Sequence, residues 1–423
     1  MASIFPFPSK TQRTLQCFAV VGGLRERLGE SVAAFRGVFR NANLRRVELA
    51  LAGSVVGEWG FAIALAVFAY QEGGAAAVGL VGLIRMMPAA VAAPFAAALG
   101  DLFRRERVML AADLIRAVLA VVAAVAAFGD VPAPLVYAIA AVMSIVSRAF
   151  LPAQGALLPS LARTPEELTA ANVASSTIES SGSFAGPALG GLLLAATSPG
   201  VAFAATAVTY LWSALFIMRI RADYEPSKDV GGGLAREAFA GFRTIAAEPR
   251  LRLLIGLFAV QTLVAGALNV LIVVAAFDLL ELGQSGVGYL NSAVGVGGLL
   301  GAFVALALVG RRRLAGDFGI GILLWGVPLT VLGLWPHPAV ALAVLAVIGV
   351  GNTIVDVSGF TLLQRSVRGE VLARVMGVVE SVFVATVGVG AILAPLLIAA
   401  IGIRGALMVT GALLPIVAAL FWR

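Results

Sequence analysis

Cysteine and histidine are almost missing from this 423-residue sequence, which contains only Cys17 and His337. A single cysteine excludes a disulfide within the chain. One cysteine and one histidine are also too few for a zinc site or for a thiol–imidazole catalytic centre. No GxxxxGK[ST] loop occurs, so the sequence shows no ATP site of its own. We therefore expect neither a metal nor a cofactor.

Charged residues are also scarce, at 13% of the chain, whereas 60% of the residues are hydrophobic and the mean hydropathy is +1.00. About 20 consecutive apolar residues are needed to cross a bilayer. The sequence contains twelve stretches of this kind, so we expect an all-α membrane protein. They lie at 47–71, 75–99, 108–128, 132–152, 170–196, 200–218, 251–277, 285–309, 318–335, 338–362, 373–400 and 404–422.

Basic residues occur in alternate gaps between these stretches. If both termini are inside, all of the 30 Lys and Arg residues lie in inside segments or at their edges, with four exceptions: Arg85, Arg116, Arg148 and Arg404. The positive-inside rule then predicts a multi-pass protein of the cytoplasmic membrane with both termini in the cytoplasm. The basic residues that give the net charge of +7 flank the spans, so we interpret them as topology signals and do not expect nucleic acid as a partner.

Polar segments divide the sequence into four parts. Residues 1–46 form a basic leader, in which 24–46 have the pattern of an interfacial amphipathic helix, although a loosely ordered tail fits equally well. Two six-span bundles, 47–218 and 251–423, flank a cytoplasmic linker at 219–250. Two such halves favour parallel repeats related by an axis along the membrane normal, with a substrate site at their interface.

A GxxxGPxxGG pattern occupies the fifth span, formed by Gly182, Gly186, Pro187, Gly190 and Gly191. It resembles the fifth-helix motif of the major facilitator superfamily, which is associated with exporters and antiporters. Proline frees a backbone carbonyl and favours a kink, and glycines let a neighbouring helix approach closely. The resemblance implies that this motif packs the two halves together on the outer side.

The segment after the second span resembles the cytoplasmic motif of the same superfamily through Asp101, Arg105 and Arg107. It departs from that motif at three positions: Ala97 and Arg104 stand where glycines are usual, and Leu102 stands where an arginine is usual. The resemblance implies that Asp101 accepts backbone N–H groups at the start of span eleven, near Ala373, and so joins the halves in the outward-facing state. A topology signal alone is the alternative.

Further matches follow the branch that includes the enterobactin exporter and related multidrug exporters, and the resemblance covers residues 40–423. They are Gly57-Glu58, Arg85, Pro88, Asp113, Arg116, Arg148, Pro152-Ala153, Leu158-Pro159, Asn352, Gln364-Arg365 and Arg374-Val375-Met376-Gly377.

Ionisable residues inside spans are costly and usually functional. Glu58 and Arg85 lie near mid-depth and are, with Glu179, Asn352, Asp356 and Glu380, our candidates for the proton and substrate cavity. Asn352 and Asp356, spaced i, i+4, are expected to share a cavity-lining face. Asp113 and Arg116, spaced i, i+3, are expected to form a structural pair near the cytoplasmic motif. For Arg148, at the end of the predicted fourth span, we expect the side chain to reach the membrane surface.

These patterns favour a secondary active transporter that exports small amphipathic compounds, drug-like or siderophore-like, in exchange for protons. Glu58 is the first candidate proton carrier, because burial favours its neutral form and a nearby Arg85 favours its ionised form. A permanent Glu58–Arg85 ion pair is the alternative. A lysophospholipid or other lipid carrier of the same fold is the second functional hypothesis. A membrane-embedded enzyme or a channel is less favoured. Partners are then a small-molecule substrate, protons and membrane lipid, and we expect a monomer.

Overall fold

The computed structural model describes residues 38–421, apart from Asp130, residues 221–242, Thr244, residues 309–313 and Arg368. Side chains within this range are not described at 94–102, 166, 305–308, 364, 369–374, 377 and 421. The predicted amphipathic helix at 24–46 and the linker at 219–250 therefore lie largely outside the described residues.

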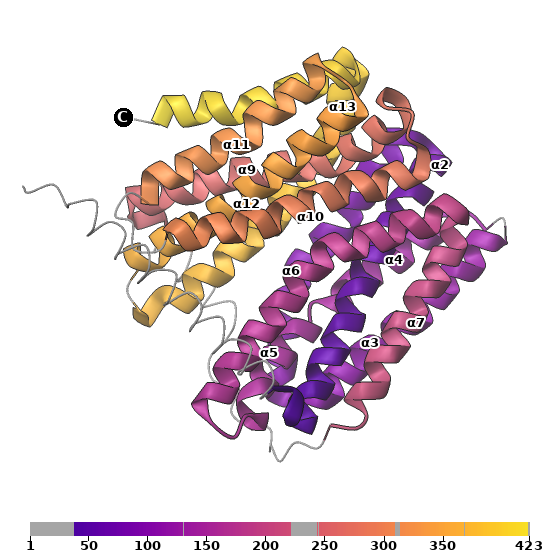
Figure 1. Cartoon of the computed structure of the whole chain (residues 1–423), viewed down its shortest axis with the longest axis vertical. Helices are drawn as coiled ribbons and strands as arrows, with labels where there is room; N and C mark the ends of the chain where they lie inside the picture. Colours follow the sequence, from indigo (N-terminus) through magenta and orange to yellow (C-terminus); the bar gives the residue numbers. More distant parts are fainter. Residues whose placement is uncertain are drawn as a thin grey trace, which may run out of the picture.

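The described chain is helical, in the order that the apolar stretches predict (Figure 1). The first half contains α2 (Ala42–Leu102), α3 (Arg105–Phe128), α4 (Ala133–Ser147), α5 (Phe150–Leu161), α6 (Pro165–Ala196) and α7 (Pro199–Ile217). The second half contains α9 (Pro249–Val274), the π-helical turn η1 (Ala275–Leu279), α10 (Gly283–Leu308), α11 (Leu314–Leu334), α12 (Pro338–Ser366) and α13 (Gly369–Phe421).

Two of these helices are hairpins of two spans. The backbone of α2 turns at Gly73 and Gly74, and that of α13 turns at Gly402. Gly74 has φ +57° and Gly402 has φ +71°, a left-handed conformation that glycine adopts without the steric cost of a Cβ atom. Each hairpin therefore changes direction without a separate loop.

Within the described residues, nine helices are long and apolar enough to cross a membrane. Counting α2 and α13 twice, and adding α6, gives the twelve predicted crossings. The helix α6 is not among the nine because Glu, Ser and Thr are frequent in its first half. The predicted fold class, an all-α protein of twelve spans, is confirmed.

Several helix boundaries differ from the prediction, among them those of the fourth and fifth spans. The fourth span is not one helix over 132–152 but a pair, α4 and α5, that continues to Leu161. The fifth begins at Pro165 rather than at residue 170, because Thr164 caps it by accepting a hydrogen bond from the Glu167 backbone N–H at 3.2 Å.

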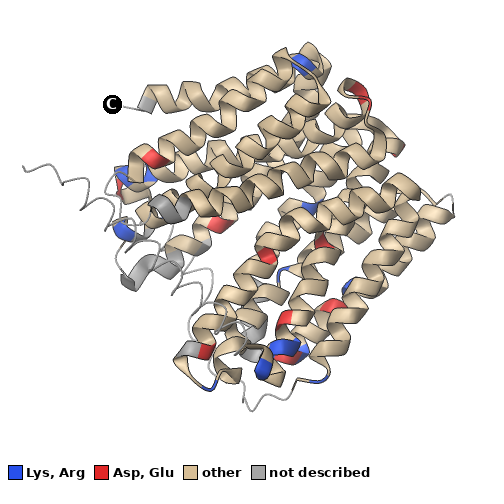
Figure 2. Ribbon diagram, in the orientation of Figure 1, with Lys and Arg blue, Asp and Glu red and all other residues tan. Residues whose placement is uncertain are grey.

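The helices form two bundles that lie side by side, α2–α7 and α9–α13 (Figure 1). We call the end at which α7 finishes and α9 begins the linker end. The bundles diverge towards it and meet at the opposite end. Most of the described Arg residues gather at the linker end of both bundles (Figure 2). Large apolar side chains such as Val91, Phe303 and Leu420 are exposed on the outside, as a lipid-facing surface requires.

Small residues form the seam between the bundles at the opposite end. A Cβ atom placed on Gly191 of α6 would lie 2.6 Å from Gly288 Cα of α10. One placed on Gly79 of α2 would lie 2.6 Å from the Ala391 carbonyl oxygen of α13. Real Cβ atoms do not approach other atoms this closely, so the seam depends on glycine at both positions.

One directional contact joins the bundles beside this seam. Tyr70, near the end of the first span, donates a hydrogen bond from its hydroxyl to Asp278 in η1. Its ring also stacks on Phe277, with the centroids 4.4 Å apart and the planes at 16°. Sequence reasoning missed this contact, since its residues are 208 positions apart.

Candidate functional site

A cavity of about 490 Å³ lies between the two bundles. Four of its lining residues are charged: Glu58 and Arg85 from the two spans of α2, Arg148 from the α4–α5 junction, and Glu179 from α6. The second bundle contributes two amides, Asn269 of α9 and Asn291 of α10. Among the described residues, the charged lining of this cavity comes from the first bundle only.

The four charges lie close enough to influence one another electrostatically. Glu179 lies within electrostatic reach of Glu58, Glu58 within reach of Arg85, and Arg85 within reach of Arg148. No ion pair within 4 Å joins any two of them in the described part of the chain. The structure therefore does not show the permanent Glu58–Arg85 pair that was the alternative for these residues.

The two arginines have spare hydrogen-bonding capacity. Arg85 Nε donates to the Ser144 hydroxyl at a long 3.4 Å. Arg148 Nε is buried and has no hydrogen-bond partner among the described residues. A buried donor without a partner loses its hydrogen bonds to water and gains none in return. Both guanidinium groups can therefore donate further hydrogen bonds to an anionic group.

The expectation that Arg148 reaches the membrane surface is wrong. The α4 helix ends at Ser147, and the backbone N–H groups of Arg148 and Ala149 bond three residues back, to Ile145 and Val146. The chain then continues as α5, so Arg148 lies in the interior of the span rather than at its end. This break places its side chain in the cavity.

Three of the residues expected in the cavity are not among the residues that line it. Asn352 donates to Asp356 at 2.9 Å, as their i, i+4 spacing predicts, and it accepts from Gln261 of α9 at 3.3 Å. This polar cluster is therefore satisfied between α9 and α12 of the second bundle, and its two candidate residues do not line the cavity. Glu380, on α13, is exposed and does not line it either. The face of α12 that was expected to line the cavity is not part of the lining described for it.

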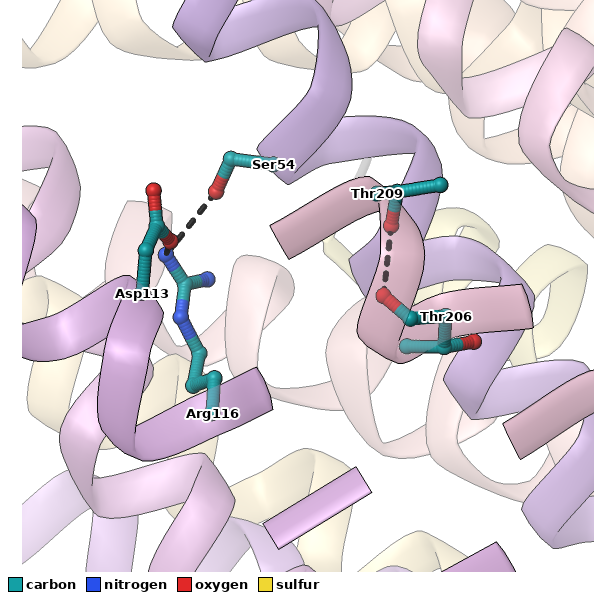
Figure 3. A network of polar contacts seen from close by, with 5 residues as sticks. All are labelled: Ser54, Asp113, Arg116, Thr206 and Thr209. Atoms are coloured by element: carbon teal, nitrogen blue, oxygen red, sulfur yellow. Dashed lines mark hydrogen bonds and ion pairs between the residues drawn. The ribbon is translucent and has the colours of Figure 1, made fainter. Parts of the chain in front are cut away.

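Asp113 and Arg116 form the expected ion pair on α3, with 0% and 1% of their side chains exposed. Arg116 also donates to the Ser54 hydroxyl of α2 at 2.9 Å, and Figure 3 shows its guanidinium between these two partners. It lies over the rings of Tyr210 and Phe150, with centroids 4.5 and 5.0 Å away. The pair therefore ties four helices of the first bundle together.

The segment after the second span is only partly described. Arg105 donates to the Ala156 carbonyl of α5 at 2.6 Å, Arg104 pairs with Glu106 at 2.7 Å, and Arg107 is exposed. The side chains of Asp101 and of residues 369–374 at the start of α13 are not described. The contact expected between them stays a prediction.

The fifth-span motif has two faces. Gly182 and Gly186 pack against Val55 and Trp59 of α2, within the first bundle. Gly190 also lies against α2, beside Gly60 and Ile63. Gly191 and the Pro187 carbonyl meet Gly288 in the second bundle. The motif therefore serves packing within one bundle as well as contact between the two.

Glu48 is a buried acid that sequence reasoning missed, because it lies at the edge of the first predicted span. Only 1% of it is exposed. Its Oε1 accepts from the Ser175 hydroxyl at 2.8 Å, and that hydroxyl accepts from Gln154 at 2.9 Å. Its Oε2 is buried without a hydrogen-bond partner among the described residues. Glu179, one turn along α6 from Ser175, is its charged neighbour.

Residues 48–369 match the model of the Major Facilitator Superfamily. The chain belongs to this superfamily. Among its relatives are proteins described as candidate bacilysin exporters, BacE, from Bacillus amyloliquefaciens and Bacillus subtilis. Each is 28% identical over 318 residues, which is 73% of this chain and 77% of the relative. The uncharacterized MFS-type transporter y4rN of Sinorhizobium fredii is 28% identical over 274 residues, or 63% of this chain and 65% of that protein.

Solved structures of other transporters share the fold of this chain at low sequence identity. A variant of the nucleoside transporter NupG has a TM-score of 0.74 at 13% identity, covering 90% of this chain and 99% of that one. A POT family transporter in complex with a thioalcohol-conjugated peptide has a TM-score of 0.72 at 12% identity, covering 90% and 95%. The chain is thus a multi-pass membrane transporter of the major facilitator fold, in a branch with export-type relatives.

Proposed function

We propose that this major facilitator protein is a proton-coupled exporter of small amphipathic compounds. In this proposal the two bundles rock around the central cavity, which opens to one side of the membrane at a time. The protein lies in the cytoplasmic membrane with both termini inside. The linker end then faces the cytoplasm, and the structure corresponds to an inward-facing form sealed at the outer side.

The observation that carries the proposal is a cavity between the two bundles that contains ionisable side chains, next to a seam that closes one end only. Carboxylates inside a membrane protein mark proton and substrate pathways. Glu58 has no ion-pair partner within 4 Å among the described residues, so it is available to gain and lose a proton as the bundles move. Arg85 lines the same cavity and lies within electrostatic reach of Glu58.

The relatives support the direction of transport, since two of them are described as candidate bacilysin exporters. A lysophospholipid or another lipid carrier of the same fold is the alternative. Four charged side chains line the cavity, which favours a small amphipathic compound with a polar end over a lipid as the substrate. Burying acyl chains against unpaired charges would cost free energy.

The test is substrate flux in proteoliposomes with an imposed pH gradient, using ethidium, a catecholate siderophore, a dipeptide and lysophosphatidylcholine as probes. We expect Glu58→Gln to abolish uphill, gradient-driven flux and to retain downhill flux, since Gln keeps hydrogen bonding but cannot change charge. Glu72→Gln is the matched control: this exposed glutamate lies on the same helix outside the cavity, and we expect wild-type flux.

Uphill flux retained in Glu58→Gln would refute the assignment of Glu58. Wild-type flux of all four probes that does not respond to the pH gradient would refute proton coupling.

A further inference from the structure

We propose that the central cavity binds small zwitterions, with the anionic group of the ligand at Arg85 and Arg148 and its cationic group at Glu58 and Glu179. This assignment rests on the transport function proposed above and names its substrate class. The chemistry is that of a free amino acid or a short peptide with both termini charged.

The first argument is that two acids and two bases line one cavity. Glu58 and Glu179 lie within electrostatic reach of each other, as do Arg85 and Arg148, and Glu58 is also within reach of Arg85. Like charges side by side in a low-dielectric site repel each other, and an ion of opposite sign relieves the repulsion. A monocation would relieve only the acidic pair, and a monoanion only the basic pair. A zwitterion relieves both.

The second argument is the spare donor capacity of the basic side. Arg148 Nε is buried without a partner among the described residues, and the Arg85 hydrogen bond to Ser144 is long. Guanidinium groups bind carboxylates through paired N–H donors. The break between α4 and α5 lets Arg148 line the same cavity as Arg85, so this side of the cavity is built by the fold and is not a surface cluster.

The third argument is size and the remaining lining. A cavity of about 490 Å³ is within the range of roughly 300–1,000 Å³ for small-molecule sites. Trp59, Ile63, Met86, Val270 and Val273 provide apolar contacts for the side chains of a ligand. Asn269 and Asn291 offer amide groups from the second bundle, which fit peptide or amide groups between the two charged ends.

The experiment compares four ligands of one shape by calorimetry on the purified full chain in lipid nanodiscs. They are Leu-Leu, its N-acetyl derivative, its C-terminal amide, and the derivative with both changes. These carry both charges, the negative charge only, the positive charge only and no charge. Because a hydrogen bond to a charged group is worth roughly tenfold or more in affinity, we expect Leu-Leu to bind at least about tenfold more tightly than each analogue.

Variants separate the two ends of the site. We expect Arg148→Met to weaken Leu-Leu and its N-acetyl derivative by about tenfold and to leave the amide unchanged. Glu58→Gln should do the reverse, weakening Leu-Leu and the amide only. This crossed pattern also shows that each variant is folded. Arg163→Met is the control, because Arg163 is exposed in the α5–α6 turn outside the cavity, and all affinities should stay at the wild-type level.

Equal affinity for Leu-Leu and its amide, or no binding of any of the four, would overturn the zwitterion site. Proton-driven flux of ethidium that persists in that case would leave the transport function standing. Conversely, crossed binding without any proton-driven flux would support the site and refute the proposed coupling.

Discussion

Replacement of Tyr70 by phenylalanine tests whether the contact with Asp278 holds the opposite end closed. The variant removes the hydroxyl that donates to Asp278 and keeps the ring that stacks on Phe277. A hydrogen bond to a charged group contributes about 1.5–3 kcal/mol. Because Asp278 is exposed, the lower limit of about 1.5 kcal/mol applies, which is about a tenfold change in an equilibrium constant.

The consequence is a shift in population from the form closed at the opposite end to the form closed at the linker end. If the form closed at the opposite end exceeds the other by about ten to one, Tyr70→Phe should bring the two near equality. Phe277→Ala removes the ring stack instead, worth about 0.5–1.5 kcal/mol, and should give a smaller shift in the same direction.

The assay is the distance between spin labels at the linker end, measured by pulsed electron paramagnetic resonance. Cysteines replace Arg163 and Ser366, which are exposed at the linker end of the first and second bundles, in a Cys17→Ser background. We expect Tyr70→Phe to increase the fraction of short distances. Tyr289→Phe, which removes the hydroxyl of an exposed tyrosine on α10, is the control. A distance distribution identical to wild type in Tyr70→Phe would refute the reasoning.

Three further predictions follow from the packing and the topology. Gly191→Leu should abolish transport while the protein remains folded, because the added side chain blocks the approach of Gly288; wild-type flux in proteoliposomes would exclude a role for this approach. Asp113→Asn should lower the free energy of unfolding by about 3–5 kcal/mol, since it leaves Arg116 buried without its counter-ion, and a melting temperature within error of wild type would contradict this. A reporter fused at Lys228 should lie in the cytoplasm and one at His337 outside, and a cytoplasmic signal at His337 would refute the proposed topology.

Features that depend on local spacing could be predicted from the sequence. The twelve spans follow from apolar length, and the Asp113–Arg116 and Asn352–Asp356 contacts follow from their spacing on one helix turn. Glu58 was placed in the cavity because its depth within the span can be counted along the helix. In each case, the geometry of a single helix determines the result.

Features that depend on packing between helices could not be predicted. The spacing of Asn352 and Asp356 gives their mutual contact but not the hydrogen bond that Gln261 of α9 donates to Asn352. The position of Arg148 depends on a helix break that apolar composition does not reveal. Glu48 lies at the edge of the first predicted span, and its burial and its hydrogen bond from Ser175 of α6 depend on how α2 and α6 pack.

The hairpin of α2 has a consequence for how binding and movement are linked. One continuous piece of chain contains two charged residues of the cavity, Glu58 and Arg85, and Tyr70 lies between them in sequence, about 18 Å along the helix from Glu58. Only Gly73 and Gly74 separate the two spans of α2, so the connection has little slack and a displacement of one span moves the other. The length of the chain at this turn should therefore matter: we expect flexible residues inserted there, which surface loops usually tolerate, to uncouple a change at the cavity from the contact between Tyr70 and Asp278.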